Sequence, residues 1–293
     1  MKTSQILLSA LFAFSTAQVS AETKMNGVVT VSESHNQVTH TTGFLVHEDS
    51  KLEATWTQSS EKVVGDIVLF HGFNGNPRLL SDLSEKISLK GFRVIIPKIS
   101  FGDFNGGKRT VKKFTEMFKD TIKYPDSDKP FGERIIFMGY SAGGWIASGV
   151  AKNLVDKVDG ILYLDPVDRF DIIKDTVPDL ANQNFPILNV VEEKGMCNRN
   201  GAARPLFSVV PTAFKGIKIN GGSHCDPLGK SADFICKLTC GAPKAKQVGI
   251  LQNFVVNFLL SYTEKGNTYS SWLPGGEKYE EHISNNDIKA FTP

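Results

Sequence analysis

The stretch IIFMGYSAGGW, residues 135–145, decides the fold of this chain. Its first four residues are bulky and apolar, which is typical of a buried strand, and the spacing of apolar residues over 145–155 is typical of a helix. Between the two lies GYSAG, a Gly-x-Ser-x-Gly pattern. The pattern alone is common by chance, but a strand before it and a helix after it make it specific. The stretch therefore predicts a sharp strand-to-helix turn centred on Ser141.

A turn of this kind crowds the backbone of its central residue, so the flanking positions must lack bulk. Gly139 and Gly143 meet this demand, and Gly144 leaves room for the helix to pack. The turn would lift the hydroxyl group of Ser141 above the sheet edge at the N-terminus of the helix, where backbone amides can stabilise an oxyanion. We therefore expect Ser141 to be a nucleophile rather than a capping serine in a glycine-rich turn.

From residue 64 onward, short apolar runs alternate with amphipathic stretches, which predicts a mostly parallel central sheet with helices on both faces. The fold class is therefore α/β, and the turn at Ser141 favours the α/β-hydrolase fold. The predicted strands are residues 63–70, 92–96, 134–138, 160–164, 186–191 and 216–219, and the predicted helices are residues 79–90, 111–122, 142–155 and 248–262.

The two ends of the chain have different patterns. Residues 27–31, 42–46 and 53–57 are short β-rich runs with no helix between them, as expected for an antiparallel edge. From residue 266 onward the chain has little periodicity and many polar residues, so we expect 266–293 to be a C-terminal tail packed on the surface. No repeat or linker divides residues 22–293, which we therefore expect to form a single catalytic domain.

The first residues are typical of a secretory signal peptide. Lys2 gives a short positive region, residues 6–14 are largely apolar, and VSA at residues 19–21 ends in small side chains. A membrane span needs about 20 apolar residues, so this run is too short for a stable membrane anchor. We expect residues 1–21 to be removed after Ala21 and the mature chain to be secreted or periplasmic.

The composition argues against nucleic acid as a partner, and the motifs argue against a nucleotide or a metal. With 33 Lys and Arg against 31 Asp and Glu, the net charge is +2, and a near-neutral surface does not attract nucleic acid. Residues 102–108 match the first part of a phosphate-binding loop, but Arg109 stands where Ser or Thr is required. No HExxH or EF-hand pattern occurs either. We expect no cofactor and no metal.

Four cysteines, Cys197, Cys225, Cys236 and Cys240, lie in the last third of the chain. An even number in an exported chain favours two disulfides, and irregular spacing with one nearby histidine argues against a zinc site. Cys236 and Cys240 would close only a tiny loop with each other. We therefore expect them to bond to Cys197 and Cys225, in an order that the sequence leaves open.

A nucleophilic serine needs a base, and the chain has six histidines. In this fold the order along the chain is serine, acid, histidine, which leaves His224 and His282. His224 follows the predicted strand 216–219 and so lies at the same sheet edge as Ser141, whereas His282 stands among charged residues of the tail. We expect His224 to be the base.

The acid has several candidates. Asp165 ends the predicted strand 160–164, and the proline after it favours an extended backbone at Asp165. Asp168 lies further into the same loop, and Glu192 and Glu193 follow the next strand, where many α/β hydrolases carry the acid. We favour Asp165 and keep the other three as alternatives.

Two backbone amides are expected to stabilise the oxyanion of an acyl-transfer reaction. One is the amide of Ala142, directly after the nucleophile. The other comes from the loop HGFN, residues 71–74, where Phe73 is the better candidate because its side chain can also line an acyl pocket. His71 is expected to support this loop rather than to act as a base.

Several of these motifs together resemble one branch of the α/β hydrolases. HGF at residues 71–73, the GYSAG turn, LDPVD at residues 164–168 and the pair His224 and Asp226 are similar to those of chlorophyllases and cutinase-like enzymes. The likeness spans roughly residues 63–260, and the LDP element also resembles pancreatic-type lipases. The resemblance implies ester hydrolysis with Asp165 as the acid. It does not imply chlorophyll as the substrate, because Tyr140 and Ala142 stand where chlorophyllases carry His and Arg.

Together these residues predict a serine hydrolase that cleaves a small-molecule or lipid carboxylic ester through Ser141, His224 and Asp165. The same three residues would serve a thioesterase, an amidase or peptidase, or an acyltransferase equally well, and these alternatives stay open. A catalytically dead binding protein of this fold would be expected to lack one of the three, and none is missing.

Overall fold

The computed structural model describes residues 30–35, 37–47, 50–59, 62–73, 75–122, 130–263 and 267–293. The predicted signal peptide, residues 1–21, lies outside these ranges and stays a prediction. Among the described helices, none has both the length and the apolar character needed to cross a membrane.

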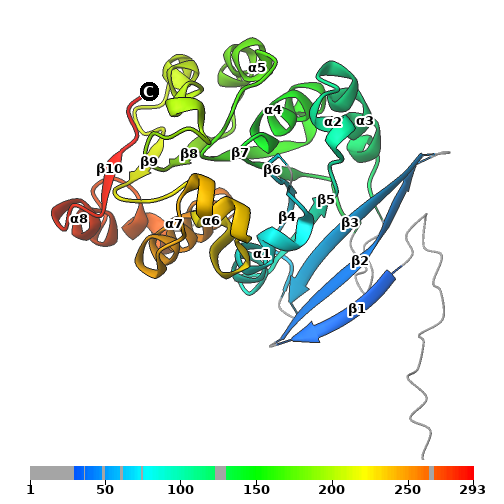
Figure 1. Ribbon diagram of the computed structural model, residues 1–293, viewed down its shortest axis with the longest axis horizontal. Coiled ribbons are helices and arrows are strands. Elements are labelled where there is room, and N and C mark those ends of the chain that lie inside the picture. The colour runs from blue at the N-terminus through cyan, green and yellow to red at the C-terminus, as the bar shows by residue number, and fades with distance from the viewer. Residues whose placement is uncertain are drawn as a thin grey trace, which may run out of the picture.

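A ten-stranded sheet runs through the described part of the chain (Figure 1), in the order β1-β2-β3-β5-β4-β6-β7-β8-β9-β10. The strands from β5 to β9 in this order pair in parallel. At one edge β1, β2 and β3 are antiparallel, and at the other β10 is antiparallel to β9. This confirms the predicted mostly parallel sheet with an antiparallel N-terminal edge. The bounds are β1 (Thr30–His35), β2 (Val38–His47), β3 (Ser50–Ser59), β4 (Gly65–Phe70), β5 (Phe92–Pro97), β6 (Ile135–Tyr140), β7 (Val158–Leu164), β8 (Ile187–Val191), β9 (Gly216–Ile219) and β10 (Ile288–Ala290).

Helices cover both faces of the sheet, as the alternating pattern predicts (Figure 1). One hydrophobic core contains the buried residues of α3, α4 and α5, and a second core on the other face contains those of α1 and α7. The bounds are α1 (Ser81–Ser88), α2 (Phe101–Phe104), α3 (Lys108–Lys119), α4 (Gly143–Asn153), α5 (Ile172–Ala181), α6 (Phe234–Cys240), α7 (Ala245–Thr263) and α8 (Glu277–Ser284).

The central strand β6 contributes to both cores. Successive side chains of a strand point to opposite faces, so Phe137 belongs to the core on the side of α4 and Met138 to the core on the side of α7. Because both faces are covered, every residue of β6 is buried, and the strand reads as a continuous apolar run in the sequence. The end of β6, and Ser141 after it, therefore lie in the middle of the sheet.

The C-terminal segment, which we expected to be a tail packed on the surface, forms regular elements that the sequence did not indicate. After a 3-10 helix at Asn267–Trp272, α8 places Tyr279 and His282 against Phe254 of α7, and β10 extends the sheet by pairing Ile288 with Ile219. Each of these short elements buries few side chains, chiefly Tyr279 and Ile288. Their sequence is therefore mostly polar, and its periodicity is too weak to reveal them.

Candidate active site

The carboxyl ends of three parallel strands bring Ser141, Asp165 and His224 together. Ser141 follows β6, Asp165 follows β7 and His224 follows β9. His224 Nε2 lies 2.8 Å from the hydroxyl oxygen of Ser141, and His224 Nδ1 lies 2.7 Å from a carboxylate oxygen of Asp165. A carboxylate only accepts hydrogen bonds, so Nδ1 carries the proton and Nε2 is left to accept from the serine hydroxyl. This is the arrangement in which a histidine can remove a proton from a serine.

The backbone at Ser141 has the tight turn that the sequence predicts. Ser141 has a φ of +53°, in the left-handed region that L-residues rarely adopt. A β-carbon on Gly139 would lie 2.5 Å from the α-carbon of Gly144, and one on Gly143 would lie 2.1 Å from the carbonyl oxygen of Phe70. Both contacts are too short, so the turn requires glycine at these two positions.

The backbone at Asp165 also turns, and here the sequence-based expectation is wrong. The proline at 166 predicted an extended conformation, whereas Asp165 has a φ of +42°. The rule for residues before proline disfavours the right-handed helical region, but it does not exclude a positive φ, which aspartate tolerates better than most residues. The amide of Asp165 donates to the carbonyl oxygen of Val190 at 2.8 Å, which fixes the turn against β8.

The Asp165 carboxylate has partners besides His224 that the sequence did not indicate. Asn198 Nδ2 donates to it at 2.8 Å, the backbone amide of Glu192 donates at 3.3 Å, and Arg204 Nη2 lies 3.5 Å away. Arg204 also donates to the carbonyl oxygen of Glu192. These donors hold the buried carboxylate in place. Asn198 and Arg204 therefore help to position the Asp165 carboxylate.

Two of the alternative acids have other partners. Asp168 accepts a hydrogen bond from the backbone amide of Lys174 at 3.0 Å, near the start of α5. Glu193 is paired with Lys218 at 2.6 Å and accepts from the amide of Gly221 at 3.1 Å. Neither carboxylate is hydrogen-bonded to His224 in the described chain.

Glu192, the third alternative, is buried and carries no hydrogen bond on either carboxyl oxygen within the described residues. Burial foremost, and then the charges of Asp226 and Asp165, raise the pKa of Glu192 well above its ordinary value. A side chain at position 222 would collide with this carboxyl, since a β-carbon there would lie 1.7 Å from Glu192 Oε2. Glu192 is thus packed against Gly222, in the loop that carries His224, and its burial favours the uncharged form of the carboxyl group.

Tyr140 makes a contact in the site that was not expected from the sequence. Its hydroxyl donates to the backbone carbonyl oxygen of His224 at 2.8 Å, and the two rings lie 5.2 Å apart. Burial foremost, with the charge of Asp165 next, raises the pKa of Tyr140 well above 10, so the hydroxyl keeps its proton. Tyr140 therefore ties the histidine loop to the strand that precedes Ser141.

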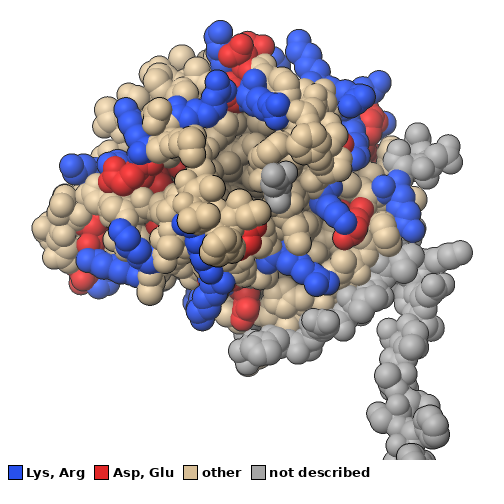
Figure 2. Space-filling view, viewed as in Figure 1, with Lys and Arg blue, Asp and Glu red and all other residues tan. Residues whose placement is uncertain are grey.

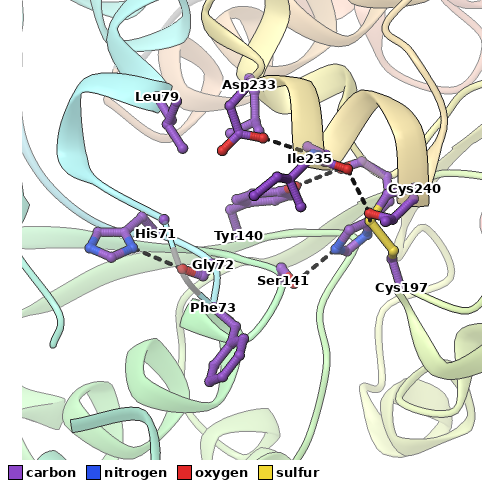
Figure 3. Close-up of a pocket in the computed structure, with 15 residues that line it drawn as sticks. His71, Gly72, Phe73, Leu79, Tyr140, Ser141, Cys197, Asp233, Ile235 and Cys240 are labelled. Atoms are coloured by element: carbon purple, nitrogen blue, oxygen red, sulfur yellow. Dashed lines mark hydrogen bonds between the residues drawn. A yellow bond between two sulfur atoms is a disulfide. The ribbon is translucent and has the colours of Figure 1, made fainter. Parts of the chain in front are cut away.

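The loop after β4 lies directly beside Ser141 (Figure 3). A β-carbon on Gly72 would come within 3.0 Å of the Ser141 β-carbon. His71 holds this loop, as predicted: its Nε2 accepts from the amide of Ile99 and its Nδ1 donates to the carbonyl oxygen of Gly72, both at 2.9 Å. Burial lowers the pKa of His71 to about 4, so the ring is a neutral support.

The two backbone amides expected at the oxyanion position are both free within the part of the chain that the structure describes. Neither the amide of Phe73 nor that of Ala142 donates a hydrogen bond to a described residue. They belong to the two segments that flank the Ser141 hydroxyl. Unpaired amides beside a candidate nucleophile are what a developing oxyanion requires.

A pocket of about 340 Å³ opens onto Ser141 and His224. Phe73 lies on one side of Ser141 and Ile235 on the other (Figure 3). The remaining walls are largely apolar and include Leu79, Tyr140 and Leu228. A pocket of this size and lining can hold an apolar group next to the serine hydroxyl.

Two disulfides surround this pocket and confirm the expected use of the cysteines. Cys197 is bonded to Cys240, and Cys225 to Cys236. Both bonds therefore end on α6, and one of them starts at the residue after His224. The sulfur atoms of Cys225, Cys236 and Cys240 lie within 4.8 Å of one another, but as disulfides they do not offer thiolates to a metal.

Comparison with known proteins supports the fold. No protein-family model matches the sequence, and no curated protein matches it. Among solved structures, the chain is similar to a dienelactone hydrolase from Anabaena variabilis, with 13% identity and a TM-score of 0.58 over 78% of this chain and 100% of that chain. It is also similar to Est1E from Butyrivibrio proteoclasticus, with 14% identity and a TM-score of 0.55 over 75% of this chain and 98% of that one. A dienelactone hydrolase-like promiscuous phosphotriesterase from metagenomic libraries has 11% identity and a TM-score of 0.56 over 78% of this chain and 100% of its own.

These similarities show that the chain has the α/β-hydrolase fold. At identities of 11–14% they carry the fold alone, without an activity or a substrate. The more specific resemblance to chlorophyllases and cutinase-like enzymes stays a prediction.

Proposed function

We propose that this protein is a serine hydrolase that cleaves carboxylic esters, with Ser141 as nucleophile, His224 as base and Asp165 as acid. The observation that carries the proposal is the chain of short hydrogen bonds from the Ser141 hydroxyl through His224 to Asp165, at 2.8 and 2.7 Å. The Ser141 end of this chain of hydrogen bonds lies at a pocket that is large enough for an acyl group. A hydrogen-bonded serine, histidine and aspartate in this order along the chain is the pattern used for acyl transfer in this fold.

In the first step the Ser141 oxygen attacks the ester carbonyl carbon while His224 Nε2 takes the hydroxyl proton. The carbonyl oxygen becomes an oxyanion, which the amides of Phe73 and Ala142 stabilise. The imidazolium that forms is stabilised by the Asp165 carboxylate. When the tetrahedral intermediate collapses, His224 returns the proton to the leaving alcohol, and the acyl group stays on Ser141 as an ester.

In the second step water replaces the alcohol. His224 removes a proton from water as the water oxygen attacks the acyl-enzyme, and then returns that proton to the Ser141 oxygen. The carboxylic acid leaves and the free serine is restored. Thioester or amide cleavage and acyl transfer would follow the same steps with another leaving group or acceptor.

We also infer that the protein acts in an oxidising compartment, as a secreted or periplasmic enzyme. Two disulfides support this inference, because disulfides persist mainly outside the reducing cytosol. The predicted signal peptide points the same way. N-terminal sequencing of the exported protein checks it, with a mature chain beginning at Glu22 as the expected result.

Labelling with a fluorophosphonate tests the central proposal, because the oxygen of an activated serine attacks the phosphorus atom of this reagent and displaces fluoride, whereas an ordinary serine does not react. The wild-type protein should be labelled at Ser141 and should hydrolyse a p-nitrophenyl ester. Ser141→Ala and His224→Ala should each lower kcat by about 10⁴- to 10⁶-fold while the protein stays folded. Ser208→Ala, which changes an exposed serine, is the matched control and should behave as wild type. Turnover that survives in folded Ser141→Ala would rule the proposal out.

A further inference from the structure

The outer side of α6 is apolar. Phe234, Ile235 and Leu238 have 75%, 71% and 73% of their surface exposed. Their spacing of one and four residues puts all three on one side of the helix. Cys236 and Cys240, also four apart, lie on the inner side and are bonded to Cys225 and Cys197. The helix is thus fixed to the protein by its two disulfides, and its apolar residues face outward.

This apolar surface continues around the mouth of the pocket. Ile235 lines the pocket from one side of Ser141 and Phe73 from the other (Figure 3). The ring of Phe101, 67% exposed, lies 5.6 Å from that of Phe73, and Met196, 77% exposed, precedes Cys197 in the pocket wall. We call this group the apolar rim; it consists of Phe73, Phe101, Met196, Phe234, Ile235 and Leu238.

Few charged groups lie at the rim: the guanidinium of Arg169 is 5.7 Å from the centre of the Phe73 ring, and Asp233 lines the pocket. Lys237 is the one charged residue in the sequence of α6, and Asp233 before it accepts a hydrogen bond from the Cys236 amide. On the face seen in Figure 2, uncharged atoms cover most of the position of α6, and both basic and acidic side chains lie beside it. Single exposed apolar residues are common on proteins, but a cluster around one opening marks a surface that contacts an apolar partner.

We propose that the apolar rim docks this protein onto a lipid–water interface, so that the ester it cleaves is part of a lipid aggregate. This inference rests on the proposed ester hydrolysis. A protein partner covering the rim would close the pocket above Ser141, whereas a lipid surface would deliver the substrate into that pocket. An interface made of zwitterionic or neutral lipids fits best, because α6 has one lysine and no carboxylate.

Docking on the rim also accounts for the two disulfides on α6. A helix with three exposed apolar residues and no buried one gains little from packing. Its covalent attachment to the loops that carry Cys197 and Cys225 keeps the apolar side outward at a fixed distance from His224. The helix therefore serves as a fixed platform and needs no opening movement before the pocket meets the lipid.

Vesicle binding tests the docking without any turnover. The Ser141→Ala protein should co-sediment with phosphatidylcholine vesicles, and the added changes Phe234→Glu and Leu238→Glu should lower the bound fraction by about tenfold or more. Neither residue lines the pocket, and no α6 residue is fully buried, so the fold should be kept. Val46→Glu is the matched control: Val46 is exposed on β2, far along the sheet, and faces Lys51 on β3. Binding that is absent, or that falls equally in the control, overturns the proposal.

Kinetics then separate docking from catalysis. With Ser141 intact, the Phe234→Glu and Leu238→Glu variant should keep kcat/KM on a short monomeric ester within about twofold and lose about tenfold or more on an emulsified long-chain ester. Equal losses on both substrates would place the damage in the pocket and overturn the docking role. Gel filtration gives a further check. If the wild-type protein were a dimer that the same changes dissociate, the rim would be an interface with a second copy of the chain, and the lipid-docking proposal would be wrong. Vesicle binding by a wild-type protein that cleaves no ester would instead uphold docking and refute the proposed hydrolysis.

Discussion

The hydroxyl group of Tyr140 donates a 2.8 Å hydrogen bond to the backbone carbonyl oxygen of His224. The residue directly before the candidate nucleophile thus holds the backbone of the candidate base. Ser141 and His224 lie 83 residues apart in the chain, yet this bond connects the segments on which both are carried. The distance from His224 Nε2 to the Ser141 hydroxyl therefore depends on Tyr140 as well as on the two side chains that it joins.

Tyr140→Phe should weaken catalysis without abolishing it. Removing the hydroxyl leaves a buried carbonyl oxygen without its donor, which costs about 1–3 kcal/mol. If the loss of this hydrogen bond displaces His224, kcat should fall about tenfold. KM should change little, because the aromatic ring at position 140, which lines the pocket, is kept. Steady-state kinetics and denaturant unfolding of both proteins measure the two effects. A fall in stability with unchanged kcat would show that the bond supports the fold alone.

Asp165→Asn and Glu192→Gln form a matched pair that tests the acid. Asparagine cannot hold the productive tautomer of His224 or stabilise its charged form, so Asp165→Asn should lower kcat by about 10³- to 10⁴-fold. Burial raises the pKa of Glu192 and so favours its uncharged form, and neither of its carboxyl oxygens is hydrogen-bonded to a described residue, so a glutamine should replace it with less than about a tenfold loss in kcat. The pH dependence of kcat in each variant completes the comparison.

Asp168→Asn and Glu193→Gln extend this comparison to the remaining carboxylates. Asp168 is bonded to the start of α5, and Glu193 to Lys218 and Gly221, so each change should lower kcat by less than about tenfold. If Glu192→Gln or Glu193→Gln were the crippling change, the acid would lie after β8 and the assignment of Asp165 would be wrong.

Sequence reasoning found the three central residues because each stands at the end of a buried strand. The order of Ser141, Asp165 and His224 along the chain follows from the order of the parallel strands that precede them. A continuous apolar run such as that of β6 can be recognised as a buried strand from the sequence alone. The partners of Asp165 could not be predicted from the sequence. Asn198 and Arg204 follow Asp165 by 33 and 39 residues along the chain, and both lie in loops of no regular pattern. Contacts of that kind depend on the tertiary fold.

Short and partly polar elements escaped prediction for a related reason. α5 buries Ile173 and Val177, but Pro178 inside it reads as a helix breaker, and no helix was predicted there. α6 buries no residue, so it has no inward apolar stripe, and its cysteines alone indicated its attachment. The positive φ of Asp165 was missed because the proline rule describes which conformations are disfavoured, not which one a neighbouring strand selects.

The buried histidine His71 should make the protein less stable in mild acid. Its pKa is about 4 in the folded protein and 6.5 in an ordinary environment. Between these two values the unfolded chain binds a proton that the folded protein does not, so stability falls as the pH decreases from 6.5 towards 4. One such group changes the free energy of unfolding by at most about 1.4 kcal/mol per pH unit.

Urea unfolding at pH 7, 6, 5 and 4.5 measures this dependence. His71→Gln cannot titrate, so the free energy of unfolding of the variant should fall less steeply over this range, even though the variant is less stable at pH 7. The difference between the two proteins should therefore narrow as the pH decreases. Parallel curves for wild type and variant would assign the acid sensitivity to other groups.

Through α6, the two disulfides join the loop of Asn198 to the loop of His224. Cys197 stands directly before Asn198, which donates to Asp165, and Cys225 stands directly after His224. Both partners, Cys240 and Cys236, belong to the same short helix. Reduction should therefore loosen both ends of the Asp165 to His224 hydrogen bond, and a reductant should lower kcat of the native protein before it unfolds it. Activity measured across a dithiothreitol series, with far-UV circular dichroism as the record of folding, checks this order of events.

Removing the disulfides one at a time should give unequal losses of stability. The bond from Cys197 to Cys240 spans 43 residues and the bond from Cys225 to Cys236 spans 11. Constraint of the unfolded chain grows with loop length, so the first should contribute about 4 kcal/mol and the second about 3 kcal/mol to the free energy of unfolding. Double alanine variants of each pair, unfolded in urea, measure both values.

The two variants should differ in kcat in the opposite order: removing the bond from Cys225 to Cys236 should lower kcat more than removing the bond from Cys197 to Cys240. Cys225 is the residue next to His224 in the chain, whereas Cys197 is connected to Asp165 only through Asn198. A Cys225→Ala and Cys236→Ala protein with wild-type kcat would show that the histidine loop is held by Tyr140 and its other contacts without the disulfide.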